Sequence, residues 1–243
     1  VQRVFFGDVN GATARVLAAE GCEVVMPPSQ GCCGALMVHA GQEQHALDYA
    51  RRTIDVFEQA NVDTIVINAA GCGSTLKEYG HLLRDDPAYA EKARVFASKC
   101  RDISEILAEL EPQARRHPLR LKVAYHDACH LQHAQRVREQ PRRVLAGIPE
   151  LELVEIAEAA LCCGSAGIYN LVEPQPAREL GDRKVQHVLA TGAQALVSSN
   201  PGCLIQIASG LERAERSMPT LHMVELIDAS IRGVYPHGLQ PRP

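Results

Sequence analysis

The chain has 243 residues, enough for two modest domains or one large one, each with its own core. Its composition, 46% hydrophobic and 22% charged, is typical of soluble proteins, and a net charge of −4 without any cluster of Lys and Arg gives no footprint for nucleic acid. The longest apolar runs, such as 64–70, are too short for a transmembrane segment. No signal peptide is expected at the start of the chain, and the missing initiating Met predicts a fragment or a processed protein.

Short apolar or β-branched runs predict strands along the chain. They lie at 4–6, 23–26, 64–68, 122–126, 152–156 and 195–199. Segments with helical spacing lie between them, at 11–19, 43–59, 88–110, 132–145, 176–190 and 223–231. Strands that alternate with helices predict βαβ units and a parallel sheet.

The order of these elements repeats, so the sequence predicts an α/β fold of two tandem repeats. Each repeat is expected to be a small parallel sheet with flanking helices, and pseudo-two-fold symmetry is expected to relate the two. The predicted domains are 1–113 and 114–243. The polar segment 111–118, which has a proline near each end, is the expected linker.

Two Cys-Cys-Gly steps are the most informative feature of the chain. Each is followed, at almost the same distance, by a lone cysteine. Core packing does not need this arrangement twice, whereas a soft metal needs several thiolates from separate loops. The first set is Cys32, Cys33 and Cys72, and the second is Cys162, Cys163 and Cys203.

The second half adds Cys129, which completes a set of four cysteines on three loops at the ends of predicted strands. Helix N-termini at such loops favour thiolates. Four thiolates suit an iron–sulfur cluster or a structural zinc ion, and adjacent cysteines favour the cluster, because several irons can give each sulfur its own metal. A disulfide between the neighbouring cysteines is the third alternative. Nine cysteines without a secretory signal favour a reducing compartment.

The first half has no cysteine that corresponds to Cys129. The repeat places that position just upstream of Val1, so this half is predicted to hold an incomplete, three-cysteine pocket close to the start of the chain. Cys22 enters a predicted strand and Cys100 lies in a predicted helix. Both are interpreted as buried structural thiols.

Other residues near the cysteines have simpler interpretations. The histidines His126, His130 and His133 around Cys129 would suit zinc, but a helix N-terminus capped by Asp127 explains the segment without them. Residues 77–81, which follow Cys72 on a helix, are expected to form a solvated or inter-subunit face. No glycine turn has the G-x-G-x-x-G pattern, so no flavin or NAD site is expected in this chain.

At these residues the chain resembles the cysteine-rich, or CCG, domain family, which includes iron–sulfur subunits of glycolate and lactate oxidation and the related subunits of anaerobic glycerol-3-phosphate dehydrogenase and heterodisulfide reductase. The glycolate oxidase type is the most similar. The segments that carry the resemblance are 10–17, 31–35, 70–73, 77–81, 131–135 and 161–167. The terminal C-x-x-C of the fullest family pattern is reduced to 72–75 and 203–206, which argues against a five-cysteine, noncubane cluster.

The resemblance implies a [4Fe-4S] cluster and ligand roles for the cysteines. The implied ligands are Cys129, Cys162, Cys163 and Cys203 in the second repeat and Cys32, Cys33 and Cys72 in the first. It also implies an electron-transfer subunit that passes electrons from a flavoprotein partner toward quinone, beside a ferredoxin-like iron–sulfur module, in the cytoplasm or peripherally at the inner face of the membrane. The alternatives are a lactate-utilisation or heterodisulfide-reductase-like subunit and a zinc-stabilised scaffold without a redox role.

Overall fold

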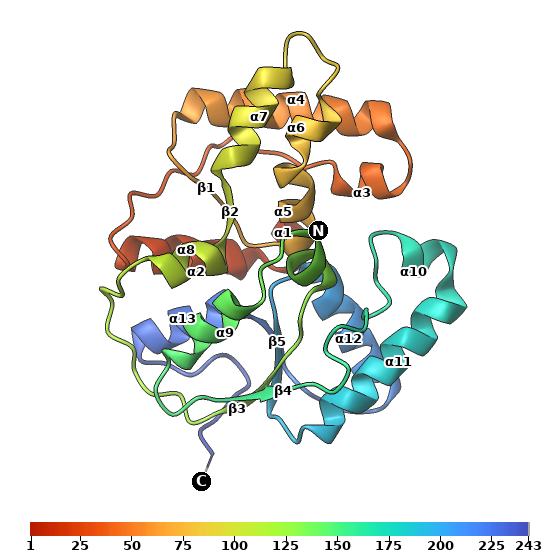
Figure 1. Cartoon of the computed structure of the whole chain (residues 1–243). Coiled ribbons are helices and arrows are strands. Elements are labelled where there is room, and N and C mark those ends of the chain that lie inside the picture. The colour runs from red at the N-terminus through yellow and green to blue at the C-terminus, as the bar shows by residue number, and fades with distance from the viewer. Residues whose placement is uncertain (243) are drawn as a thin grey trace.

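The computed structural model describes residues 1–242, which fold into helices around two small parallel sheets (Figure 1). The elements of the first half, in chain order, are α1 (Gln2–Phe5), α2 (Gly7–Ala19), α3 (Ala35–His39), α4 (Glu43–Ala60), β1 (Ile65–Ile67), α5 (Ala70–Lys77), α6 (Tyr79–Leu82), α7 (Ala90–Lys99), β2 (Cys100–Asp102) and α8 (Ile103–Glu109). Those of the second half are β3 (Lys122–Tyr125), the π-helical turn η1 (His130–Ala134), α9 (Glu139–Ala146), β4 (Glu152–Glu155), α10 (Tyr169–Val172), α11 (Pro174–Ala190), β5 (Ala195–Ser198), α12 (Pro201–Arg213), β6 (Thr220–His222) and α13 (Met223–Arg232).

The larger sheet has the strand order β4-β3-β5-β6, and the smaller sheet pairs β1 with β2. Every pair is parallel. All residues of β5 are buried, as expected for a central strand covered on both faces by helices. The predicted α/β class with two small parallel sheets is confirmed.

The two halves share one succession of elements. The strand, cysteine-bearing helix, strand and helix of β1, α5, β2 and α8 correspond to those of β5, α12, β6 and α13. The helices nevertheless pack across the halves, because α2 packs against α13 and α9 packs against α8 (Figure 1). The largest hydrophobic cluster accordingly contains Val16 and Ile103 from the first half and Val123 and Leu226 from the second. The core therefore couples the halves, and the division at residue 113 remains a prediction.

Four expectations about the elements are wrong. Residues 4 and 5 end α1 and Phe6 joins it to α2, so 4–6 form no strand, and residues 23–26 pair with no strand in the described chain. The predicted helix 88–110 is interrupted by β2, because Asp102 ends that strand and starts a new helix through a capping box with Glu105. The predicted helix 132–145 is divided into η1 and α9.

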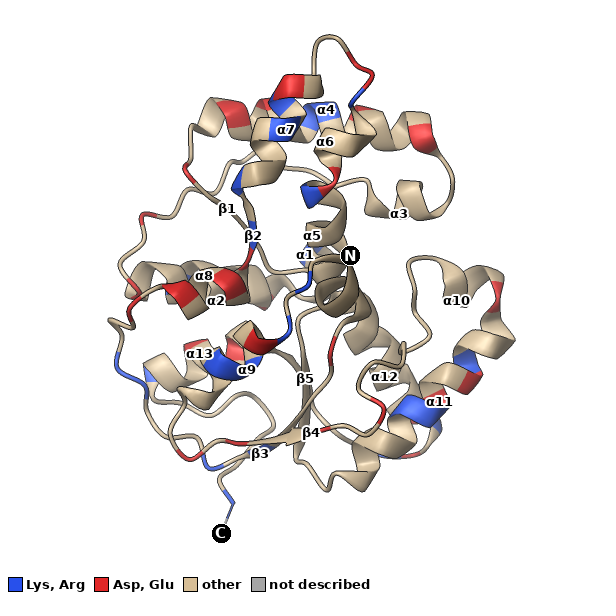
Figure 2. Ribbon diagram, viewed as in Figure 1, with Lys and Arg blue, Asp and Glu red and all other residues tan. Residues whose placement is uncertain are grey.

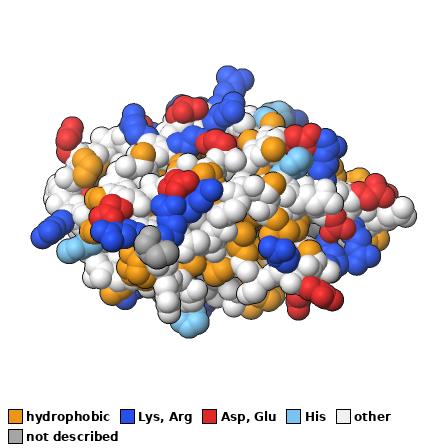
Figure 3. Space-filling model, turned by 90° about the horizontal axis from the view of Figure 1, so that it is seen from below, with side chains coloured by type: hydrophobic (Ala, Val, Ile, Leu, Met, Phe, Trp, Pro, Cys, Tyr) orange, Lys and Arg blue, Asp and Glu red, His pale blue; other side chains and the backbone are white. Residues whose placement is uncertain are grey.

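Acidic and basic residues are interspersed along the helices, on α4, α7, α9 and α11 among others (Figure 2). The face seen from below likewise mixes both signs with hydrophobic side chains (Figure 3). The short helices α3 and α10 contain no Lys, Arg, Asp or Glu. Among the described residues, no helix combines the length and the apolar character that a bilayer crossing requires.

Candidate metal centre

Three neighbouring strands of the larger sheet lead into the cysteine loops of the second half. Cys129 follows β3, the pair Cys162-Cys163 lies between β4 and α10, and Cys203 lies in the first turn of α12, directly after β5. Because β4, β3 and β5 are parallel neighbours, their carboxyl ends meet at one edge of the sheet. The structure brings these four cysteines together there: Cys129 interacts with Cys162, Cys162 with Cys163, and Cys163 with Cys203.

These contacts lower the pKa of two of the four thiols and raise the pKa of the other two. Hydrogen bonding from Cys129 and Cys163 lowers the pKa of Cys162, and hydrogen bonding from Cys163 lowers the pKa of Cys203. The two thiols that donate to Cys162 have raised pKa values, because the interaction with Cys162 raises the pKa of both Cys129 and Cys163. Two of the four sulfurs are thus held toward the thiolate form, which is the form that binds metal.

His126, the residue after β3, also lies in this pocket. His126 is only 2% exposed; its ring interacts with the Cys203 thiol, whose pKa it lowers, and has no other hydrogen-bond partner among the described residues. One ring nitrogen of His126 and the sulfurs of Cys163 and Cys203 lie within 4.8 Å of one another. A buried imidazole whose only hydrogen-bonding partner is a buried thiol is a polar group that a metal ion or a cluster would satisfy, so the donor set fits such a group.

Donors from the surrounding loops point at the sulfurs. The Gly164 N–H donates to Cys162 Sγ at 3.4 Å, and Asn200 Nδ2 donates to Cys203 Sγ at 3.2 Å. Such N–H···S contacts stabilise thiolates and tune the potential of clusters that thiolates hold. His130 Nδ1 lies 3.6 Å from Cys129 Sγ, whereas no side-chain hydrogen bond involves His133 in residues 1–242.

The first half builds a similar but more open pocket from three cysteines. Cys32 and Cys33 precede α3, and Cys72 lies in the first turn of α5 after β1. Hydrogen bonding from Cys33 lowers the pKa of Cys72, and interaction with Cys33 raises that of Cys32. The Gly34 N–H donates to Cys32 Sγ at 3.5 Å, as Gly164 does to Cys162 in the other half.

The amino terminus lies beside this pocket. The pKa of Cys72 is lowered mainly by Cys33 and slightly by the positive charge of the Val1 ammonium, which also acts against the raised pKa of Cys32, so the first residue is close to the two thiols. Figure 1 shows the N-terminus next to α5, the helix that carries Cys72. The structure therefore places the start of the chain at the three-cysteine pocket.

The glycine of each Cys-Cys-Gly step has a left-handed backbone, with φ of 77° at Gly34 and 89° at Gly164. A Cβ atom at Gly164 would lie 2.2 Å from the carbonyl oxygen of Ala177, and one at Gly34 would lie 3.0 Å from Tyr49 Cβ. Both conformation and space therefore require glycine at these steps. The turn directs the glycine N–H back to the first sulfur of its pair.

The two pockets face each other across the halves. His39 Nε2, at the end of α3, lies 3.2 Å from His130 Nε2, and the two rings meet edge to face. The first turns of α5 and α12 also meet, because the Gly71 N–H donates to Asn200 Oδ1 at 3.1 Å. His39 and Asn200 were missed in the sequence. The position of Asn200 three residues before Cys203 is the only local signal for either.

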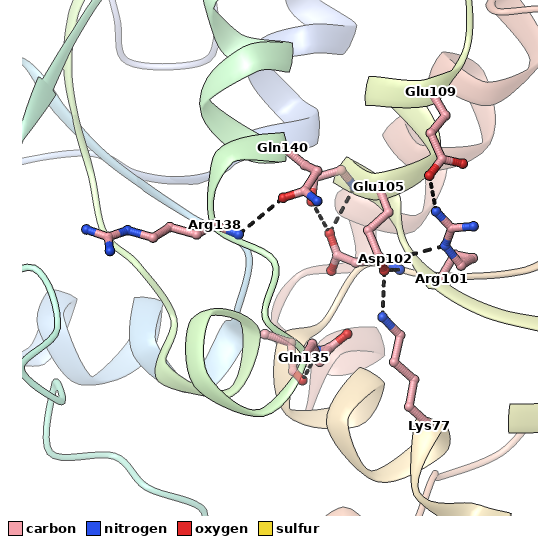
Figure 4. Close-up of polar contacts among 10 residues, drawn as sticks. Lys77, Arg101, Asp102, Glu105, Glu109, Gln135, Arg138 and Gln140 are labelled. Atoms are coloured by element: carbon pink, nitrogen blue, oxygen red, sulfur yellow. Dashed lines mark hydrogen bonds and ion pairs between the residues drawn. The ribbon is translucent and has the colours of Figure 1, made fainter. Parts of the chain in front are cut away.

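Residues 77–81 after Cys72 are only partly solvated, because Glu78 and His81 are exposed whereas Lys77 and Tyr79 make contacts inside the chain. Lys77 Nζ binds Glu105 Oε2 at 2.6 Å, and Figure 4 shows Lys77 pointing at Glu105 while Arg101 approaches from the other side. Tyr79 is fully buried and donates to the Cys33 carbonyl at 2.7 Å. Gln135, also in Figure 4, donates from the end of η1 to the Ala70 carbonyl at 2.9 Å. This face therefore holds the halves and the first pocket together.

The two remaining cysteines have structural surroundings. Cys100 is 2% exposed and its thiol donates to the Phe96 carbonyl at 3.4 Å. Cys22 is half-buried and packs against the largest hydrophobic cluster. All nine cysteines are free, so the structure contains none of the disulfides that were considered.

Comparisons with known proteins agree with this geometry. A family model described as the cysteine-rich domain matches residues 1–77 and 123–208, and these ranges contain all seven clustered cysteines. The probable glycolate oxidase iron-sulfur subunit of Bacillus subtilis (strain 168) is 40% identical over 91% of this chain and 51% of its own length, so the chain spans about half of that relative.

Two further proteins are similar over most of the chain. Lactate utilization protein A of Shouchella clausii (strain KSM-K16) is 30% identical over 93% of this chain and 94% of its own length. The crystal structure of a hypothetical protein from Helicobacter pylori superposes with a TM-score of 0.67 over 92% of this chain and 45% of that one, at 11% identity, and so shows the fold alone.

Proposed function

Because the chain belongs to the cysteine-rich domain family, with two copies of the domain, we propose that it is an iron–sulfur electron-transfer subunit of a 2-hydroxy-acid oxidase or dehydrogenase. The observation that carries the proposal is the second pocket, where four free thiols from three strand ends meet the buried His126. A bound cluster would accept and release one electron at a time.

The chain's own residues give each pocket a defined role. Cys129, Cys162, Cys163 and Cys203 would hold a [4Fe-4S] cluster, while Gly164 and Asn200 donate hydrogen bonds to its ligand sulfurs. In the first half Cys32, Cys33 and Cys72 would supply three thiolates to a metal or cluster. The burial of Cys163 and Cys203 keeps water from the second pocket, and burial is one determinant of cluster potential.

The names of the relatives, iron-sulfur subunits of glycolate oxidase, imply partner subunits. In the complex that the family resemblance implies, a flavoprotein subunit would oxidise glycolate, a ferredoxin-like iron–sulfur module would stand beside this chain, and electrons would pass toward quinone at the inner face of the membrane. This chain alone should not oxidise the hydroxy acid. Glycolate-dependent dye reduction by the isolated, flavin-free chain would refute this division of labour.

Two alternatives rest on particular observations. A lactate-utilisation subunit is favoured by the match to lactate utilization protein A over nearly the whole length of both chains. A zinc-stabilised scaffold is favoured by His126, Cys163 and Cys203, whose ligand atoms lie within 4.8 Å and would suit a tetrahedral ion. Adjacent Cys162 and Cys163 count against a zinc ion held by all four cysteines, since both would then have to bind one small ion.

Anaerobic purification separates these alternatives. We expect iron and acid-labile sulfide near four each per fully occupied pocket, by the definition of a [4Fe-4S] cluster, and an electron paramagnetic resonance signal on oxidation or reduction. Stoichiometric zinc with neither iron nor a signal would contradict the electron-transfer role. The protein is then reconstituted with the flavoprotein and given either glycolate or lactate. The substrate that reduces the cluster, seen as a change in its signal, is the one that the complex oxidises.

A further inference from the structure

Lys184, on α11, is a fully buried cation without a charged partner. Its exposed fraction is 0%, and its ammonium donates to the Glu158 backbone carbonyl at 2.7 Å. No carboxylate in residues 1–242 lies within ion-pair distance of it. The Glu158 carboxylate instead pairs with Arg183 and His187, which also lie on α11. A buried ammonium without a counter-charge is costly, so a negative group nearby would account for its presence.

The position of Lys184 on α11 identifies that negative group. Ala177, Gly181 and Lys184 recur at the spacing of one helix face, and all three are buried. The Ala177 carbonyl lies against Gly164, and Gly181 lies against the Cys163 carbonyl. The face that ends in Lys184 thus runs along the Cys-Cys-Gly loop of the second pocket.

The nearby acidic groups support this placement. Burial lowers the pKa of Lys184, whereas the charges of Cys163, Glu158, Asp127 and Cys162 act in the opposite direction. The two sulfurs in that set are proposed cluster ligands. A cluster held by four thiolates carries net negative charge, and reduction by one electron adds another.

The corresponding helix of the first half lacks the cation. Helix α4 buries Ala46, Ala50 and Thr53 at the same spacing as Ala177, Gly181 and Lys184. Thr53 therefore takes the place of Lys184, and its hydroxyl donates to the Tyr49 carbonyl at 2.8 Å within its own helix. Only the second pocket has a buried positive charge at this position.

We propose that Lys184 is the counter-charge of the cluster in the second pocket and raises its reduction potential, so that this pocket is the stronger electron acceptor of the two. The inference rests on the proposed electron-transfer function. Lys184 acts only through the attraction between its positive charge and the negative charge of the cluster, so it is a positioning residue and not a catalytic one. A bound cluster would take up one electron supplied by the partner's reduced flavin, and no bond to Lys184 would form or break. A fixed positive charge in a poorly solvated site stabilises the product of that step, which carries one more negative charge.

The test is a redox titration of the second cluster, followed by electron paramagnetic resonance, in wild type, Lys184→Met, Lys184→Arg and Arg183→Met. Arg183→Met is the matched control, because it removes one positive charge from the next residue of α11, whose side chain is 57% exposed. We expect Lys184→Met to lower the equilibrium constant for reduction at least about tenfold, which for one electron is about 59 mV. Lys184→Arg should stay near wild type, and Arg183→Met should shift much less because solvent screens it.

The outcomes are distinguishable. An unchanged potential in Lys184→Met, with iron retained, would show that Lys184 only supports the Glu158 loop and would overturn the inference alone. If the Lys184→Met variant binds no cluster, Lys184→Gln replaces it, because the glutamine amide can still donate to the Glu158 carbonyl. Its reduction potential is then compared with that of wild type in the same way. Absence of iron and of any signal in wild type would overturn the proposed function itself.

Discussion

Asp102 and His222 occupy the same position in the two halves, although their side chains have opposite acid–base character. Each is the last residue of a strand and the N-cap of the next helix, and each accepts the backbone N–H two residues further on. A capping box with Glu105 or Glu225 completes each cap. Each side chain is at most 1% exposed and keeps one atom without a partner in residues 1–242, Asp102 Oδ2 or His222 Nε2. The shared cap predicts opposite responses to pH.

Acidification should destabilise the protein through His222. Burial lowers the pKa of His222 to about 4, from 6.5 in the unfolded chain. The fold therefore favours the neutral ring, and this contribution to stability is complete above pH 6.5 and disappears as the pH falls to 4. It amounts to about 3 kcal/mol. His222→Asn keeps a neutral cap and should lose correspondingly less free energy of unfolding between pH 7 and pH 4.5 in urea titrations. The exposed His45→Asn is the control, and equal losses in wild type and His222→Asn would contradict the prediction.

Asp102 should act in the opposite direction. Burial raises the pKa of Asp102 to about 6, from 3.8. The fold therefore favours the protonated acid, and this contribution is complete below pH 3.8 and disappears as the pH rises through 6, again by about 3 kcal/mol. Asp102→Asn keeps an acceptor for the Ser104 N–H and should unfold at higher urea concentration than wild type at pH 7, with little difference at pH 4. A less stable variant at pH 7 would show that the Lys77 charge holds Asp102 ionised.

The strands show which parts of the fold could be predicted from the sequence and which could not. The strand at 195–199 was recognisable because its run is apolar and fully buried as β5. Residues 23–26 have a similar composition but no neighbouring strand, and a strand exists only where a neighbour supplies hydrogen bonds. The three-residue β2 was hidden inside a helical pattern, and the only local sign of it was the spacing of Asp102 and Glu105.

Part of the candidate site could likewise be predicted from the sequence, and part could not. The repeated spacing of Cys32-Cys33 and Cys162-Cys163 was visible in the sequence, because a duplication preserves distances along the chain. The meeting of His39 with His130 and of Gly71 with Asn200 depends on how the halves pack, and no local pattern encodes that packing. The approach of His126 to Cys163 and Cys203 likewise becomes evident only in three dimensions.

Replacement of a proposed ligand should affect metal binding far more than replacement of a structural thiol. Cys162→Ser should remove most of the iron from the second pocket, because ligand loss is coupled to loss of order in the loops that the cluster holds. Cys22→Ser and Cys100→Ser should have the same iron content as wild type, since they change only packing. The Phe96 carbonyl can still accept a hydrogen bond from a serine at position 100. Iron analysis of the three variants purified side by side is the measurement. Equal iron content in all three would argue against the ligand role of Cys162.

The two Cys-Cys-Gly glycines should differ in how well they tolerate alanine. Gly164→Ala combines a left-handed backbone with a Cβ 2.2 Å from a backbone oxygen, so the loop or α11 must move. We expect a loss of about 2–4 kcal/mol in the free energy of unfolding, together with loss of metal from the second pocket. Gly34→Ala has a similar backbone, but its nearest contact is a side-chain atom at 3.0 Å, so we expect about 1–2 kcal/mol. Gly7→Ala, with nothing within 4 Å, is the control and should be nearly neutral. Urea unfolding with iron analysis ranks the three, and a Gly164→Ala variant as stable as Gly34→Ala would show that the contact with Ala177 relaxes without cost.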